Sequence, residues 1–226
     1  MVSAQEVTAG AINLCRDKNL DVFEFLKQEL SLDGAYHHDI QYIDDPGARF
    51  GNAVLTKFPV KNKKVLTLKG FKPLTFEEID GASAFEIRPQ LPRHLLDTII
   101  EIEGREVHAM SWHGAWTAPP TDTDETLRQA KVVADYLKSL SGPFILGGDL
   151  NNVSGSKTVR LIGEVAINWM KDSGAVQTTH PKIHKIVPKG FLVDYIFSSR
   201  HFNLLSISVP EVLVSDHLPV VAEFEF

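Results

Sequence analysis

The pattern of hydrophobic and polar residues predicts many short strands with a few helices between them. Apolar residues recur at near-helical spacing over residues 8–30, which predicts a first helix. A second helix is predicted to open at Thr121, where hydroxyl and carboxyl side chains can cap free backbone N–H groups, and to stop at Gly142-Pro143. A shorter helix is predicted over residues 158–168.

Strands are predicted where short apolar or alternating runs are bounded by turn residues. The run His94–Glu103 alternates and reverses through Gly104, which is a hairpin pattern. Because strands and helices do not alternate strictly, the pattern favours an α+β fold over a doubly wound parallel sheet. That fold is a two-sheet β-sandwich flanked by helices. The predicted strands cover residues 52–56, 63–68, 85–88, 94–103, 106–111, 143–146, 193–198, 204–209 and 218–226.

Length and composition fit one large domain spanning residues 1–226 better than two domains. The net charge of -6 and the pI of about 5.8 argue against a general nucleic-acid coat protein, but they are compatible with an enzyme that meets phosphate through a metal. Cys15 is the only cysteine, so no intrachain disulfide can form and the redox compartment stays open. No apolar run approaches the roughly 18 residues of a membrane span. The absence of a signal-peptide pattern favours the cytoplasm.

Polar side chains stand at three strand ends that are far apart in the sequence. Asp149 and Asn151 follow Gly147-Gly148, His113 follows the strand predicted over residues 106–111, and Asp216-His217 precedes the last strand. Each has an ordinary interpretation, since Asp-x-Asn forms turns readily and a lone histidine is more often a core residue. Three such ends together indicate a single catalytic cluster.

A fourth feature supports this interpretation. Asp194 lies inside the apolar run Val193–Phe197, where a carboxylate is costly to bury without a partner. A histidine that it orients is the natural partner, and His217 is the candidate.

With these motifs in place, the chain resembles the endonuclease/exonuclease/phosphatase superfamily, which has the deoxyribonuclease-I-like fold. The resemblance implies a four-layer α/β-sandwich and extends from about residue 4 to the end of the chain. The stretches that carry it are Phe50–Val60, Trp112–Trp116, Gly148–Asn151, Val193–Phe197 and Ser215–Val220, in the order usual for the family.

The resemblance implies a metal-dependent hydrolase of phosphate esters in which water attacks in line. Glu6, in Gln5-Glu6, would be the principal ligand of Mg²⁺, with Mn²⁺ as the alternative, and Asp216 would support it through water. Asp149 would position or deprotonate the attacking water, and Asn151 would hold that water or a phosphate oxygen. His217, oriented by Asp194, would donate to the transition state.

Other candidate residues are less specific. His113 would contact the phosphoryl group or assist the leaving group, and which histidine is the general acid stays open. Arg93 is interpreted equally well as a phosphate-binding residue or as a solvated cation at the start of a strand. Trp116, like Trp112, is either core or pocket wall, or it stacks on a base. The pairs His180/His184 and His37/His38 are interpreted as loop residues, the first because Pro181 breaks the helix that would align it.

The amino terminus departs from the family pattern. Members begin with a strand that carries an Asn, followed by a helix and the strand leading into Gln-Glu, whereas this sequence starts directly before Glu6. Either the start is truncated or the chain is a natural minimal variant. We expect the loss of one active-site amide and an unpaired sheet edge, and a lost leader sequence could once have preceded Met1.

The substrate is not fixed by the resemblance, because this fold serves nucleases, phosphatases and phosphodiesterases. With 29 acidic and 23 basic residues, the chain favours a small phosphate ester or a nucleic-acid end over a long duplex. The alternative is a catalytically impaired binding module on the same scaffold. The chain retains all four of the acid and histidine motifs described above, and this argues against that alternative. The oligomeric state stays open.

Overall fold

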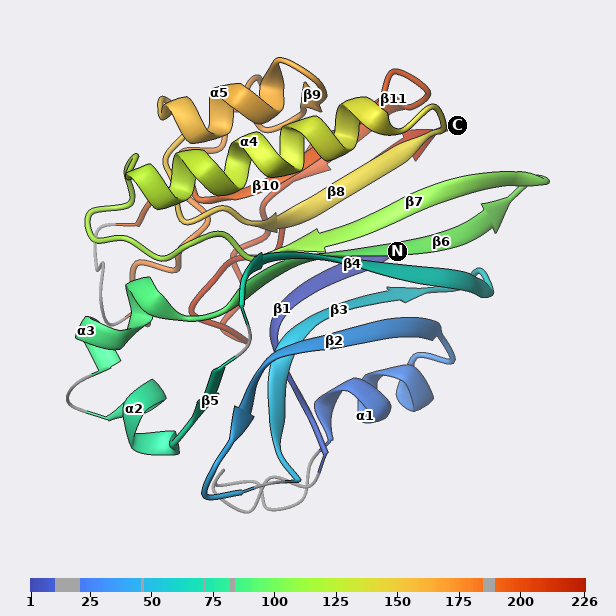
Figure 1. The fold of residues 1–226 in the computed structure, drawn as a ribbon. Coiled ribbons are helices and arrows are strands. Elements are labelled where there is room, and N and C mark those ends of the chain that lie inside the picture. The colour runs from blue at the N-terminus through green and yellow to red at the C-terminus, as the bar shows by residue number, and fades with distance from the viewer. Residues whose placement is uncertain (11–20, 46, 71, 82–83, 185–189) are drawn as a thin grey trace. The chain divides into compact units, whose positions relative to one another are not determined.

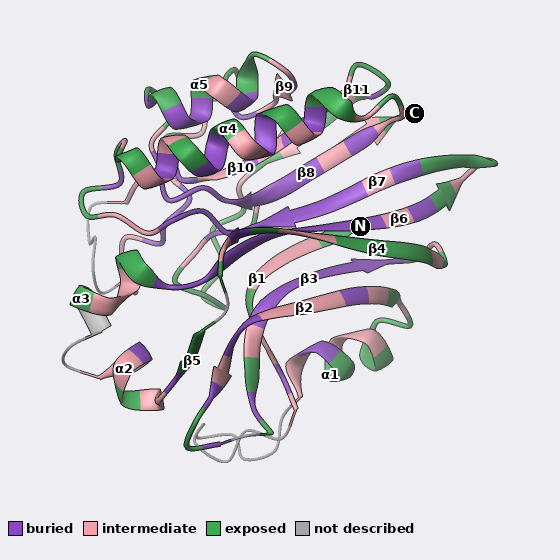
Figure 2. Ribbon diagram, viewed as in Figure 1, coloured by how far each residue is buried: buried purple, intermediate pink, exposed green. Residues whose placement is uncertain are grey.

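The fold is that of a computed structural model in which residues 1–10, 21–45, 47–70, 72–81, 84–184 and 190–226 are described. The chain divides into two compact units, Met1–Trp116 and Thr117–Phe226. Each unit has its own strands, helices and buried residues (Figures 1 and 2). The single domain expected from the sequence stays a prediction.

The first unit contains a four-stranded sheet in the order β1-β3-β2-β5. Its strands are β1 (Val2–Ala9), β2 (Asp33–Tyr42), β3 (Arg49–Thr56) and β5 (Lys72–Leu74). β3 pairs antiparallel with both β1 and β2, and β5 joins β2 in parallel. Among the described residues β1 has a strand on one side only, so the predicted sheet edge is present.

A second sheet in this unit is the antiparallel meander of β4 (Val60–Lys69), β6 (Arg93–Ile102) and β7 (Arg105–Trp112). Glu103 and Gly104 join β6 to β7 with φ values of 52° and 77°, and two positive φ angles in a two-residue loop suit the twist of a hairpin. β2 and β3 contact β6 and β7, so the two sheets face each other and form a sandwich. The predicted hairpin and sandwich are therefore confirmed.

Short helices surround the first unit's sheets. α1 (Val22–Glu29) begins at Asp21, whose carboxylate accepts from the Glu24 N–H, and it contacts β1. α2 (Phe76–Asp80) starts with a capping box at Thr75. α3 (Ala84–Ile87) and the 3₁₀ helix η1 (Arg88–Gln90) follow before β6.

The second unit holds β8 (Phe144–Asp149), β10 (Asp194–Ser198) and β9 (Ile167–Asn168), with β10 paired antiparallel to both neighbours. β11 (Asn203–Ser208) pairs with β12 (Val221–Glu225).

Two helices of this unit pack on each other: α4 (Asp124–Ser139) and α5 (Lys157–Gly163). α4 buries a stripe of residues three or four positions apart, visible along the helix in Figure 2. The members of the stripe are Thr126, Gln129, Ala130, Val133, Ala134 and Leu137.

Three of the predicted elements were wrong in part. Thr8 and Ala9 belong to β1 rather than to a helix, residues 11–20 lie outside the described residues, and α1 begins only at Val22. Residues 85–88 are helical, because a four-residue run cannot separate the two periodicities and the Pro89 that follows has no N–H for a sheet. The helix predicted over 158–168 ends at Gly163, and β9 follows. None of the described helices is long and apolar enough to cross a membrane.

Candidate active site

Two carboxylates lie opposite each other in the second unit. Asp149 ends β8 and Asp194 begins β10, and the two residues are direct partners in the antiparallel ladder. The Leu150 N–H donates to the Val193 carbonyl at 2.9 Å, which extends the pairing one residue further. Directly opposed residues project to the same face of a sheet, so the two acidic groups share one side.

His217 joins this pair through a hydrogen bond. Its Nδ1 lies 2.8 Å from Asp194 Oδ2. Because an ionised carboxylate only accepts, Nδ1 carries the proton and donates it. The predicted pairing of Asp194 with His217 is confirmed.

Electrostatics at His217 favour its charged form. Burial lowers the pKa of the imidazole, but the hydrogen bond to Asp194 and the charges of Asp194, Asp149 and Asp216 outweigh burial and raise that pKa to about 10. The imidazole of the metal-free protein is therefore protonated at neutral pH.

Asp149 and Asn151 form a tight local turn. The Asn151 N–H donates to Asp149 Oδ1 at 2.7 Å, and Asn151 adopts a left-handed backbone with φ of 52°. Both side chains are buried. The ordinary turn interpretation and the functional one therefore coexist, since the turn fixes the carboxylate's direction. A non-glycine residue at positive φ is uncommon, and such positions gather at functional sites.

The segment Thr178–His180, which the sequence analysis did not connect to the site, joins β10 to the loop that carries His217. Thr178 Oγ1 accepts from the N–H groups of Val193 and Asp194 at 3.0 Å each. Thr179 bridges to His217, and the His180 N–H donates to the Asp216 carbonyl at 2.7 Å. Thr178–His180 thus connects the start of β10 to the Asp216-His217 loop. Nothing in its local pattern marks this role, because the contacts are all distant in sequence.

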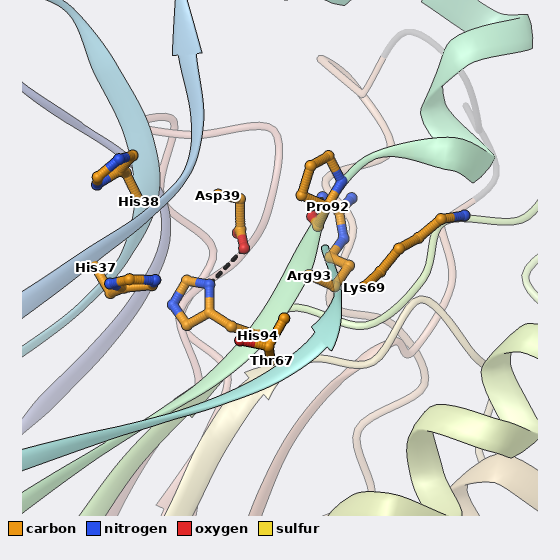
Figure 3. A pocket seen from close by; sticks show the side chains of 8 residues that line it. All are labelled: His37, His38, Asp39, Thr67, Lys69, Pro92, Arg93 and His94. Carbon is orange, nitrogen blue, oxygen red and sulfur yellow. Dashed lines mark hydrogen bonds and ion pairs between the residues drawn. The ribbon is translucent and has the colours of Figure 1, made fainter. Parts of the chain in front are cut away.

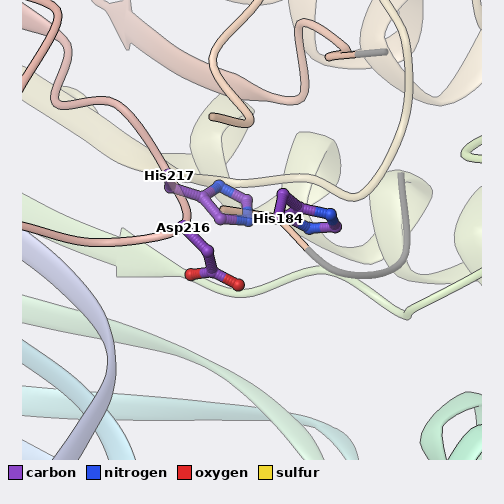
Figure 4. Close-up of side chains that lie close together, drawn as sticks. All are labelled: His184, Asp216 and His217. Atoms are coloured by element: carbon purple, nitrogen blue, oxygen red, sulfur yellow. The ribbon is translucent and has the colours of Figure 1, made fainter. Parts of the chain in front are cut away.

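His184 is a site residue that sequence reasoning placed in a loop without function. The His184 N–H donates to the His180 carbonyl at 2.9 Å, so one helical turn forms with Pro181 at its start, where proline is tolerated. The His184 ring lies 5.5 Å from the His217 ring, and Figure 4 shows both beside Asp216.

The donor atoms in this unit suit a divalent cation. Asp149, Asp194 and His217 offer ligand atoms that all lie within 4.8 Å of one another, and so do His184, Asp216 and His217. Carboxylate oxygens are the ligands that Mg²⁺ prefers, and Mn²⁺ accepts both oxygen and imidazole.

Glu6 lies at an irregular position of β1 in the first unit. The pairing of β1 with β3 shifts between Ala4 and Val7, and Glu6 has a φ of 57° and an exposed side chain. Next to it, Gln5 Nε2 donates to Ser111 Oγ at 2.8 Å. The Gln5-Glu6 part of β1 is therefore tied to β7 two residues before His113.

Arg93 supports the loop that carries His113. Its Nε donates to the Gly114 carbonyl at 2.9 Å and a terminal nitrogen donates to the Pro92 carbonyl at 3.0 Å. Arg93 is 3% exposed, so its interpretation as a solvated cation is wrong. His113 itself is buried.

The two tryptophans differ. Trp112 is core, whereas Trp116 is half-buried under the Arg88 guanidinium, whose carbon lies 5.9 Å from the ring centroid.

Comparison with known proteins identifies the family of the chain. The model of the Endonuclease/Exonuclease/phosphatase family matches residues 2–217. The chain belongs to this family. No curated protein is similar enough in sequence to count as a match.

Solved structures of the family share its fold. An endonuclease/exonuclease/phosphatase family protein from Leptotrichia buccalis is 18% identical with a TM-score of 0.68, over 99% of this chain and 86% of that chain. A Bacteroides thetaiotaomicron mannosyl-6-phosphatase is 19% identical with a TM-score of 0.62, over 90% and 80%. D. rerio TDP2 complexed with a single-strand DNA product is 17% identical with a TM-score of 0.61, over 90% and 81%. The α+β sandwich expected from the sequence is therefore confirmed.

A group of histidines in the first unit lies outside the motifs that carry the family resemblance. His37 and His38 lie in β2, not in a loop as predicted, and with Asp39 and His94 they line a small pocket (Figure 3). His94 Nδ1 is hydrogen-bonded to Asp39, and the His37 ring meets the His94 ring edge-on at 4.6 Å. Burial, followed by the neighbouring His94, lowers the pKa of His37 to about 4, so this imidazole is neutral at physiological pH.

Proposed function

We propose that this family member is a divalent-metal-dependent hydrolase of phosphate esters. The observation that carries the proposal is the arrangement of Asp149, Asp194 and His217: the two acids are direct ladder partners, and His217 Nδ1 lies 2.8 Å from Asp194 Oδ2. Asp194 orients the imidazole, and Asp149 is held by the turn at Asn151. The two carboxylates therefore have different roles.

Asp149 is proposed to position or deprotonate the attacking water. Its Oδ1 accepts from the Asn151 N–H, which fixes the direction of the carboxylate. The Asn151 amide would hold the same water or a phosphate oxygen. General-base catalysis of this kind is worth about 10²–10⁴-fold.

His217 is proposed to donate a hydrogen bond to the phosphoryl oxygens. Its Nδ1 is occupied by Asp194, so Nε2 is the nitrogen that would face the substrate. A protonated imidazole stabilises the negative charge that develops in the transition state. His113 is proposed to contact the phosphoryl or leaving group, and Arg93 and Trp116 to bind substrate.

Glu6 and Asp216 are proposed to hold the cation, Mg²⁺ or alternatively Mn²⁺. The positive φ of Glu6 supports a specialised role, because a bulge at this point re-aims the carboxylate. The cation, when bound, would neutralise charge on the phosphoryl oxygens.

The substrate is proposed to be a small phosphate ester or a nucleic-acid end. The structural neighbours include a mannosyl-6-phosphatase and a complex with a single-strand DNA product, so this fold accommodates both classes. The acidic balance of the chain opposes tight binding of a long duplex.

The test is hydrolysis of bis-p-nitrophenyl phosphate, plasmid DNA and inositol phosphates with and without Mg²⁺ or Mn²⁺. Asp149→Asn and His217→Ala are expected to abolish turnover without unfolding the protein. Asn keeps the turn's acceptor, so the unfolding temperature of Asp149→Asn should change little, whereas His217→Ala loses the hydrogen bond to Asp194 and should unfold at a lower temperature. Asp172→Asn and His201→Ala change exposed residues of the same unit and are the matched controls. Inactivity of the native chain on the whole panel, with no measurable metal binding, would favour the binding module.

A further inference from the structure

Exposed aliphatic residues lie in the two chain segments that carry His184 and His217. Two segments, residues 179–184 and 211–217, run side by side, since Thr179 bridges to His217 and Lys182 Nζ lies 2.9 Å from Glu211 Oε1. Ile183 belongs to the first segment and Val212-Leu213-Val214 to the second. We call these four residues the aliphatic rim.

The rim is exposed to an unusual degree. Leu213 and Val214 are 67% and 82% exposed, and Ile183 and Val212 are also exposed. Single exposed apolar residues are normal, but three in succession expose surface that costs solubility unless it serves a function. Val214 stands two residues before Asp216, so the exposed run adjoins the proposed phosphoryl site.

The chemistry of the rim selects one kind of ligand. It has no aromatic side chain on which a nucleobase could stack. The neighbouring cation, Lys182, forms an ion pair with Glu211 and is not directed to the backbone phosphates that a nucleic acid would bring. Branched aliphatic side chains fit a hydrocarbon. The net charge of -6 opposes attraction to an anionic surface, so an uncharged or zwitterionic one is favoured.

We propose that the substrate is amphiphilic, a phosphodiester whose hydrocarbon chain lies on the aliphatic rim while its phosphate reaches His217. The inference rests on the proposed hydrolase function and narrows its substrate class. The inference also predicts binding that requires no catalysis, because the aliphatic rim should bind the protein to a lipid surface even without metal.

The experiment compares hydrolysis of methyl, butyl and octyl p-nitrophenyl phosphate at concentrations below micelle formation. Each methylene that is fully buried should raise affinity about fourfold, and each methylene that is half-buried on the rim about twofold. The octyl ester should therefore exceed the methyl ester in kcat/KM by on the order of 100-fold. In the double variant Leu213→Ser/Val214→Ser this ratio should fall to about tenfold or less. Leu205→Ser, 60% exposed on β11, is the matched control and should keep the native ratio.

A second arm measures sedimentation with phosphatidylcholine vesicles in EDTA. The native chain and Leu205→Ser should bind, and the double variant should not. Chain-length-independent hydrolysis without vesicle binding overturns the inference and leaves the hydrolase proposal standing. Vesicle binding without hydrolysis of any ester overturns the hydrolase proposal and with it the assignment of the amphiphile as a substrate. A native dimer that the double variant dissociates would assign the rim to self-contact and also overturn the inference.

Discussion

Replacing Asp194 by Asn tests the pairing on which the proposed chemistry depends. Asn has the same shape, so packing around β10 is retained, but it removes the charge that lies 2.8 Å from His217 Nδ1. The amide oxygen of Asn can still accept from Nδ1, but a hydrogen bond without the charge is weaker, so the free energy of unfolding should fall by about 1–2 kcal/mol. The variant should therefore fold.

The expected effect on turnover depends on pH. In the native, metal-free chain the pKa of His217 is about 10, so the imidazole is protonated at both pH 6 and pH 8. Without the Asp194 charge we expect this pKa to fall toward the ordinary value of about 6.5. The protonated fraction would then be roughly three quarters at pH 6 and about 3% at pH 8. The ratio of native to variant rate should rise by about twentyfold between the two pH values.

Two measurements check this reasoning. Initial rates on bis-p-nitrophenyl phosphate at pH 6 and pH 8 give the ratio, and an NMR titration of the metal-free protein gives the pKa of His217 directly. Asp172→Asn is the control, because it removes an exposed charge in the same unit. An equal loss at both pH values, or native His217 titrating near pH 6.5, would refute the assigned role of Asp194.

Three further predictions concern stability. Asp122→Ala should cost about 1–2 kcal/mol in denaturant unfolding, because this carboxylate accepts from the first two N–H groups of α5 at 2.8 and 2.9 Å. Gly51→Ala should cost about 3 kcal/mol or more, or prevent folding, because the new Cβ would lie 2.0 Å from the His37 carbonyl oxygen. His108→Gln should destabilise more at pH 6 than at pH 9, since the hydrogen bond to Asp97 raises the pKa of His108, and stability from a raised pKa is present below the unfolded value and lost as pH rises through the folded one.

Each of these has an opposite outcome. An unchanged midpoint for Asp122→Ala would mean that water replaces the cap, and an unchanged midpoint for Gly51→Ala would mean that β2 and β3 separate more easily than their ladder implies. A pH-independent effect of His108→Gln would show that the Asp97 contact does not alter proton binding.

Much of the site could be predicted because its residues carry a local signal. An acid in an apolar strand needs a partner, and Asp194 has one in His217, as expected. The hairpin at Gly104 was likewise predictable, because glycine between alternating runs is a turn signal. The residues around Glu6 carry no signal for a metal-binding role, and only the family resemblance pointed to it.

The other site residues could not be predicted, because their roles depend on tertiary contacts that have no signal in the local sequence. Thr178 and His184 reach the site through hydrogen bonds and ring contacts to residues more than a dozen positions away. Arg93 was open between two interpretations because its carbonyl partner at Gly114 belongs to another strand end. Strand β2 was missed since His37-His38-Asp39 interrupts its hydrophobic alternation.

The ladder between β8 and β10 has an evolutionary consequence. Asp149 and Asp194 owe their spacing to backbone register and not to loop conformation, so substitutions around them can accumulate without changing the distance between the two acids. Losing or gaining one residue inside β10 is a different event, because a slip by one position turns every side chain of the strand to the other face. Insertions and deletions in descendants of this chain should therefore be confined to the connections outside these two strands.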